Sequence, residues 1–136
     1  MVKTKFSISL HIMTILAMYK DDWHTSTDIA KSLNTNPVLV RKEIANLKKG
    51  NLIESKEGKH GGIRLLKNAN KIYLSDIFLL AKGDEHVLSL SNNTPAPTCR
   101  VGKQINKNLK VVLKNIDNSI IESLKDQTLE SFKNQF

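Results

Sequence analysis

The sequence of 136 residues contains one cysteine, Cys99, and no apolar run that approaches the roughly 20 residues needed to span a bilayer. A single cysteine excludes an intrachain disulfide framework and any site that takes several thiolate ligands from one chain. The apolar stretch 7–19 is interrupted by polar residues and lacks a small-residue cleavage signal, so we do not interpret it as a signal peptide. We therefore expect a cytoplasmic protein without a membrane partner.

Motifs for nucleotide binding, metal binding and catalysis are also missing. Gly61 and Gly62 lack the lysine-serine or spaced-glycine context of a phosphate loop, and His11 has no second histidine at metal-binding spacing. A cysteine nucleophile needs a positioned base, and nothing in the sequence places His86 beside Cys99. We therefore predict neither a metal site nor an enzyme.

The composition is that of a soluble domain with an anionic partner. The 40% hydrophobic content fits one compact domain plus an appendage. The net charge of +8 and the pI near 9.6 suit a nucleic acid, although a membrane surface would satisfy the same charge. Composition does not choose between these partners.

The stretch 25–49 is typical of two short helices joined by a polar turn. Hydroxyl side chains at 25–27 can cap the first helix, and the polar residues 34–36 favour a turn because their short side chains compete for the backbone. Pro37 suits the first position of a second helix, where no amide hydrogen is required. This pattern predicts a helix-turn-helix.

The second helix combines an apolar side with a basic one. Val40, Ile44 and Leu47 recur at helical spacing and can pack inward. Arg41 and Lys42 then face outward near the amino end, where they can reach base edges or phosphates in a DNA groove. An ordinary amphipathic helix with a solvated basic face would show the same pattern, so this segment alone leaves both interpretations open.

A wing follows the second helix. The runs 52–56 and 63–66 resemble strands, and the glycine-rich segment 57–62 between them resembles a turn. From residue 37 to residue 66 there are seven basic and three acidic side chains, a net charge of +4. We predict a mostly α fold with a small β-wing, in other words a winged helix-turn-helix, whose helix and wing share the charge needed for phosphate contact.

At the amino end we expect a short basic arm, residues 1–5, that includes Lys5. A core helix should begin near Phe6. Trp23 is interpreted as an aromatic plug in the core between this helix and the helix-turn-helix, and His24 as a surface residue.

Beyond the wing, a short helix capped at Ser75 and Asp76 should end near Gly83. We assign 1–83 to the DNA-binding domain, 84–98 to a linker loop, and 99–136 to a long dimerisation helix with a tail helix that covers it or its partner. An isolated amphipathic helix needs a partner for its apolar stripe, so we predict a homodimer that reads a palindrome. The expected interface consists of Val101, Ile105, Leu109, Val112, Ile116 and Ile120.

Several of these segments together resemble the Rrf family of bacterial winged-helix regulators. The resemblance covers nearly the whole chain and rests on FSISLHIM at 6–13, TSTDIAKSLNTNPVLVRK at 25–42, LKKGNLI at 47–53, GGIRL at 61–65 and IYLSDI at 72–77. The sequence is most similar to cluster-free Bacillus-type members, with NTNP before the recognition helix and Cys-x-Val-Gly at 99–102.

The resemblance implies a dimeric DNA-binding transcriptional regulator that acts as a repressor. Cluster-binding members carry three cysteines near this linker, so it implies no iron–sulfur cofactor here. It makes Cys99 a candidate redox sensor, with a thiol that carries no signal as the alternative. A winged-helix module that binds protein rather than DNA is the competing function. The expected DNA contacts are Lys5, Thr25, Ser26, Asn34, Thr35, Asn36, Val38, Leu39, Arg41, Lys42, Lys56, Lys59 and His60.

Overall fold

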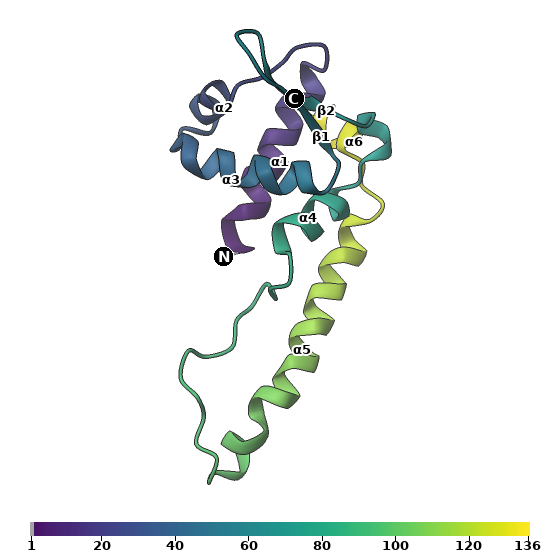
Figure 1. The fold of residues 1–136 in the computed structure, drawn as a ribbon. Coiled ribbons are helices and arrows are strands. Elements are labelled where there is room, and N and C mark those ends of the chain that lie inside the picture. The colour runs from purple at the N-terminus through teal and green to yellow at the C-terminus, as the bar shows by residue number, and fades with distance from the viewer. Residues whose placement is uncertain (1) are drawn as a thin grey trace.

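A computed structural model describes the backbone of residues 2–136 and the side chains from Thr4 onward. The described chain is mostly helical with one two-stranded antiparallel sheet, which confirms the expected winged helix-turn-helix. Figure 1 shows that α5 projects away from a body formed by the other elements. The elements are α1 (Val2–Met18), α2 (Ser26–Leu33), α3 (Pro37–Lys49), β1 (Ile53–Lys56), β2 (Gly62–Leu65), η1 (Ala69–Lys71), α4 (Leu74–Lys82), α5 (Arg100–Leu124) and α6 (Leu129–Lys133).

Local side-chain chemistry sets the bounds of α2 and α3. The Thr25 hydroxyl accepts a hydrogen bond from the Asp28 amide at 3.1 Å and starts α2. Asn34, with φ of 52°, ends it in the left-handed conformation that asparagine tolerates. The Asn36 side chain accepts from the Val38 amide at 2.9 Å, and a proline follows at the start of α3. The expected helix-turn-helix is therefore present.

The wing has a third backbone segment beside its two strands. Strand β1 pairs with β2 in the register Ile53↔Leu65 to Lys56↔Gly62. His24 adds a bridge to Ile63 through two backbone hydrogen bonds of 3.0 and 2.8 Å. His24 is half-buried rather than the free surface residue that was expected, because its backbone pairs with the wing.

The core is centred on α1. Ile12, Met13 and Leu16 are fully buried there, against Val40 and Leu47 of α3. The last helix joins this core as well, because α6 packs on α1 and η1 and Leu129 is fully buried. The expectation that the tail covers the long helix is therefore wrong, and the tail completes the winged domain instead.

Two helix starts differ from expectation. Helix α1 begins at Val2, so the described part of the expected arm 1–5 is helical, and the side chains of residues 1–3 lie outside the described residues. Helix α4 begins at Leu74 with Tyr73 as its cap, two residues ahead of the predicted cap at Ser75. The Asp76 carboxylate reaches back to accept from the Tyr73 amide at 2.9 Å, which explains the earlier start.

The segment between α4 and α5 contains no helix or strand among the described residues. Gly83, with φ of 57°, closes α4 as expected, and Cys99 is the residue that precedes the first turn of α5. Within residues 2–136, no helix is both long and apolar enough to cross a membrane.

Candidate nucleic-acid interface

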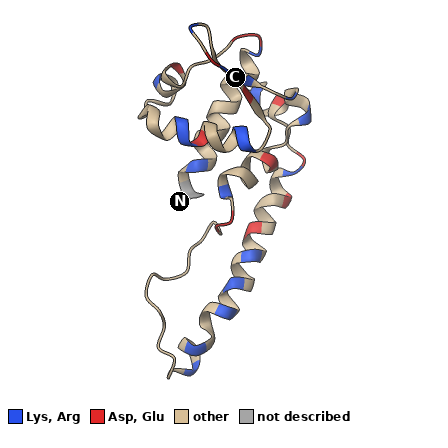
Figure 2. Cartoon of the chain, in the orientation of Figure 1, with Lys and Arg blue, Asp and Glu red and all other residues tan. Residues whose placement is uncertain are grey.

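Helix α3 presents two unlike sides. Val40 and Leu47 have no exposed surface, whereas Val38 and Leu39 are 48% and 44% exposed, and Arg41 and Lys42 are exposed too. Large apolar side chains left in water beside two cations are typical of a binding surface. Figure 2 shows lysine and arginine recurring along α3 and along α5.

Two polar contacts fix α3 against the body. The Ser9 hydroxyl donates to the Glu43 carboxylate at 3.2 Å, and the Asn46 side-chain amide donates to the Leu80 carbonyl at 2.8 Å. This second bond turns the Asn46 side chain towards α4. Glu43 is only 6% exposed, and its partner could not be predicted because Ser9 lies 34 positions away in the chain. These contacts hold the exposed side of α3 in one orientation.

The turn between α2 and α3 brings several predicted residues together. A hollow of about 500 Å³ at this turn is lined by residues of α2, of the turn and by Pro37. The Asn36 side-chain oxygen caps α3, and the residue is exposed. Of the predicted contacts at this turn, Asn34 and Asn36 are exposed and Thr35 is half-buried. Thr25, which is exposed, and Ser26, which is half-buried, lie at the other end of α2.

The wing carries exposed cations on a braced hairpin. Lys56, Lys59 and His60 are all exposed. The Arg64 guanidinium lies 4.3 Å from the centre of the Trp23 ring and forms an ion pair with Glu54 at 2.8 Å, while the Lys56 ammonium lies 5.7 Å from the same ring.

Trp23 is therefore half-buried beneath two cations, and its assignment to the core is wrong. The ring faces attract positive charge, so Trp23 supports the wing rather than the interior. The position of Lys5 also differs from expectation. Lys5 is a half-buried residue of α1 rather than part of a free arm, and α1 begins on the opposite side of α3 from the wing (Figure 1).

Cys99 is exposed at the amino end of α5. The backbone amides of Gly102 and Val101 lower the pKa of the Cys99 thiol below its ordinary value. His86 does not serve it as a base, because His86 is bonded to Asp117 at 2.6 Å. Asp117 lies on the same helix about 25 Å further on, at 1.5 Å per residue.

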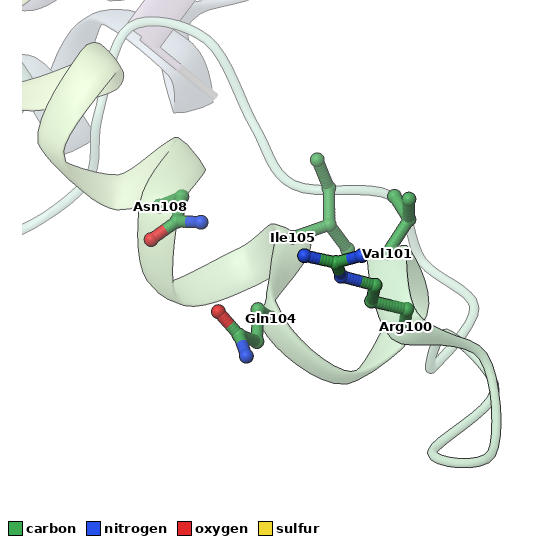
Figure 3. A pocket seen from close by; sticks show the side chains of 5 residues that line it. All are labelled: Arg100, Val101, Gln104, Ile105 and Asn108. Atoms are coloured by element: carbon green, nitrogen blue, oxygen red, sulfur yellow. The ribbon is translucent and has the colours of Figure 1, made fainter.

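The amino-terminal half of α5 leaves apolar side chains in solvent. Val101, Ile105 and Val112 of the predicted interface are 65%, 37% and 51% exposed, and Leu109, Ile116 and Ile120 are half-buried. A hollow of about 280 Å³ near Cys99 is lined by residues of α5 alone. Figure 3 shows Val101 and Ile105 on one side of the helix, with Gln104 and Asn108 on another. Val111, 62% exposed, was missed because it lies one position off the predicted stripe.

The chain is similar along nearly its whole length to known transcriptional regulators. A family model named Rrf2, described as an iron-dependent transcriptional regulator, matches residues 2–135. YwnA of Bacillus subtilis (strain 168), named as a candidate HTH-type transcriptional regulator, is 30% identical over 134 residues, which is 98% of each chain.

Two solved structures share the fold. A candidate transcriptional regulator from Lactobacillus plantarum gives a TM-score of 0.80 at 22% identity and covers 97% of this chain and 89% of that chain. CymR of Bacillus subtilis, its global cysteine regulator, gives a TM-score of 0.71 at 21% identity and covers 98% and 96%. At these identities the likeness concerns the fold.

The iron in the family description does not fit the side chains of this chain. Iron–sulfur clusters are held chiefly by several cysteine thiolates, and the full sequence has one cysteine. Over the part of the chain that the structure describes, no three His, Cys, Asp or Glu side chains gather where they could hold a metal ion. A single chain therefore does not supply the ligands of such a cluster.

Proposed function

The chain belongs to the Rrf2 family of transcriptional regulators, and on that premise we propose that it represses transcription by binding a palindromic DNA operator as a homodimer. Membership makes it a DNA-binding regulator rather than an enzyme. We propose in addition that the operator is palindromic, that two copies bind it with two-fold symmetry, and that binding represses transcription.

The exposed side of α3 is the observation that supports the proposal. A helix fits the major groove of DNA, where an arginine can donate two hydrogen bonds to guanine and an apolar side chain can contact the thymine methyl group. Arg41 provides the first kind of contact, and Val38 and Leu39 the second. Lys42, with Lys59 of the wing, provides phosphate contacts that set the register on the duplex.

The exposed stripe of α5 supports a homodimer. The helix has 25 residues, about 37 Å at 1.5 Å per residue, and Val101, Ile105 and Val112 are exposed on it in a single chain. Pairing two copies along this stripe buries apolar surface on both and relates them by a two-fold axis. Two α3 helices then meet two half-sites separated by about one turn of DNA.

A salt-dependent titration tests DNA binding. Duplexes selected from a random library by the unmodified protein serve as probes, and binding is measured at several salt concentrations. Arg41→Ala should weaken specific binding roughly 5- to 150-fold, the effect of losing one bidentate base contact. Lys59→Ala should weaken binding to all sequences alike and reduce the salt slope by about one.

Lys71→Ala is the matched control, because Lys71 is an exposed cation in η1 outside the interface. It should bind like the unmodified protein. Selection that enriches no sequence, or Arg41→Ala with full affinity, would favour the competing function of a winged-helix module that binds protein.

Cys99 extends the proposal to a redox response. Its thiol is exposed and its pKa is lowered, which favours the reactive thiolate. An oxidant that accepts two electrons would join two Cys99 sulfurs, or one Cys99 and a small thiol, in a disulfide with release of two protons. Operator occupancy measured under oxidising and reducing conditions should differ for the unmodified protein and not for Cys99→Ser. An identical response in both would remove this role.

A further inference from the structure

A buried carboxylate lies in the middle of α5. Asp117 is 3% exposed and is, with Leu113, one of the two buried residues of that helix. Burying a charged group costs free energy unless it is paired and hydrogen-bonded. The position therefore needs partners, and an apolar residue would meet the packing requirement without them.

The partners of Asp117 come from two other parts of the chain. The His86 imidazole nitrogen Nδ1 lies 2.6 Å from Oδ2, and the Val87 amide donates to Oδ1 at 3.1 Å. The Lys82 ammonium lies 3.8 Å from Oδ2, with a side chain only 16% exposed. Lys82 ends α4, and the other two begin the linker, so both carboxylate oxygens tie α5 to the exit of the winged domain. We call these four residues the Asp117 clasp.

The clasp lies where α5 leaves the winged domain. At its carboxyl end α5 is held by Leu124, which packs on the core, about 10 Å from Asp117 along the axis. In the other direction the helix continues for 17 residues to Arg100, about 25 Å. That part projects from the body (Figure 1). A rotation of about 10° at the clasp would therefore move its far end by about 4 Å, by the same helix dimensions.

We propose that the Asp117 clasp fixes the angle between α5 and the winged domain, and thereby the spacing of the two operator half-sites that the dimer accepts. This inference rests on the proposed function, because the angle matters to DNA only if two copies pair through α5. Because the two copies are related by a two-fold axis, any change of this angle moves both α3 helices. A duplex is sensitive to such a change, because one added base pair alters both the separation and the rotation of the half-sites.

The decisive measurement is half-site spacing, which simple loss of stability does not shift. Full-length unmodified protein and each clasp variant are used to select binding sites from a random duplex library, and the half-site sequence and the spacing are read separately. For His86→Ala and Asp117→Ala we expect the same half-site sequence with a broadened or shifted spacing. The fraction of selected duplexes that have the original half-site spacing should fall about fivefold, which is the size of effect that a modest coupling free energy produces.

Matched variants separate positioning from folding. Glu122→Gln removes an exposed carboxylate from the same helix and should keep the original spacing. His86→Ala keeps the inference testable if Asp117→Ala does not fold, since the His86 side chain is 36% exposed and is one of three partners. Circular dichroism and thermal melting identify which variants are folded.

The outcomes distinguish this inference from the proposed function. Unmodified protein that selects no paired half-sites would overturn the proposed function and the role of the clasp with it. Unmodified protein with a sharp spacing that every folded clasp variant retains would overturn the role of the clasp alone.

Discussion

Gly62 shows how a single residue shapes the wing. Its φ is +147°, and a Cβ atom at this position would lie 2.5 Å from the carbonyl oxygen of His24. That carbonyl accepts the Ile63 amide in the bridge between His24 and the wing. Only glycine allows the backbone to approach this closely in this conformation.

Replacing this residue should weaken the fold. Gly62→Ala should lower the free energy of unfolding by about 1–3 kcal/mol, because the strained conformation and the clash both favour the unfolded chain. Gly58→Ala is the control: Gly58 also has a positive φ, +101°, but nothing lies within 4 Å of its Cβ position. Chemical denaturation measures both. If both variants lost the same free energy of unfolding, the close contact between Gly62 and the His24 backbone would have no role in stability.

Cys99 gives a second prediction for one residue. Because the amides of Gly102 and Val101 lower the pKa of its thiol, the folded protein should contain more thiolate at neutral pH than the unfolded chain. The rate of alkylation by iodoacetamide, followed against pH, should therefore have a lower midpoint in buffer than in concentrated urea. The urea sample is the control, since it keeps the sequence and removes the helix. Coincident midpoints would show that the start of α5 does not activate the thiol.

At this scale the sequence predicts what a residue does within its own turn of helix. The capping roles expected near Thr25 and Pro37 follow from local chemistry and are confirmed. Glu43 and Asn46 were not predictable, because their partners lie 34 positions away in each case. Trp23 was assigned to the core on its size alone, whereas its surroundings depend on two cations of the wing.

The contact between α4, the linker and α5 governs a response to pH. Burial raises the pKa of Asp117. The hydrogen bonds from His86 and Val87 and the charges of Lys82 and His86 together lower this pKa by more than burial raises it, so it lies below the ordinary value of an aspartate. A carboxyl group with a lowered pKa in the folded state stabilises that state when ionised. The stabilisation is fully present above the pKa of the unfolded chain, about 3.9, and is lost as the pH falls through the folded pKa.

Asp117→Asn should therefore be less stable than the unmodified protein at neutral pH, by about 1–3 kcal/mol for a damaged buried hydrogen-bond set. The difference should begin to shrink as the pH falls below about 4, because the carboxyl group then takes up a proton in the unfolded chain. It should vanish only when the pH has passed the lower pKa of the folded state and the native carboxyl group is protonated as well. Urea unfolding at a series of pH values measures this, with Glu122→Gln as an exposed carboxylate control. A difference that stays constant down to the acid limit would contradict a charged Asp117.

At the scale of elements, periodicity predicted α3 and its exposed side well, since alternation of buried and exposed positions is written into thirteen consecutive residues. The packing of α6 was missed because Leu129 fills a space on α1, and no local pattern reveals that space. The position of Lys5 was missed for a related reason: residues 2–5 contain no helix breaker, so α1 extends through them.

For the whole molecule, the main prediction concerns self-association. Ile105→Asp combined with Val112→Asp places two charges on the exposed stripe of α5. In a dimer that buries the stripe, each added charge costs desolvation free energy. The dissociation constant of the dimer should therefore rise about 100-fold or more, since each tenfold change corresponds to roughly 1.4 kcal/mol. Sedimentation velocity at several concentrations measures the shift towards monomer. Operator affinity should fall in parallel because each monomer contacts one half-site.

Asn115→Asp is the control for this experiment, as it adds a charge at an exposed position of α5 outside the stripe. It should leave the sedimentation pattern unchanged. A doubly substituted protein that sediments like the unmodified one would show that the two copies meet through another surface.

The burial of Leu129 in the interior of the winged domain places a constraint on the order of events during synthesis. The residues that we propose as DNA contacts leave the ribosome early, but the last piece of their supporting interior lies beyond α5 in the chain. Nascent domains fold once all their parts have emerged. A growing polypeptide therefore cannot complete the interior of the winged domain until translation has passed the whole of α5 and reached Leu129.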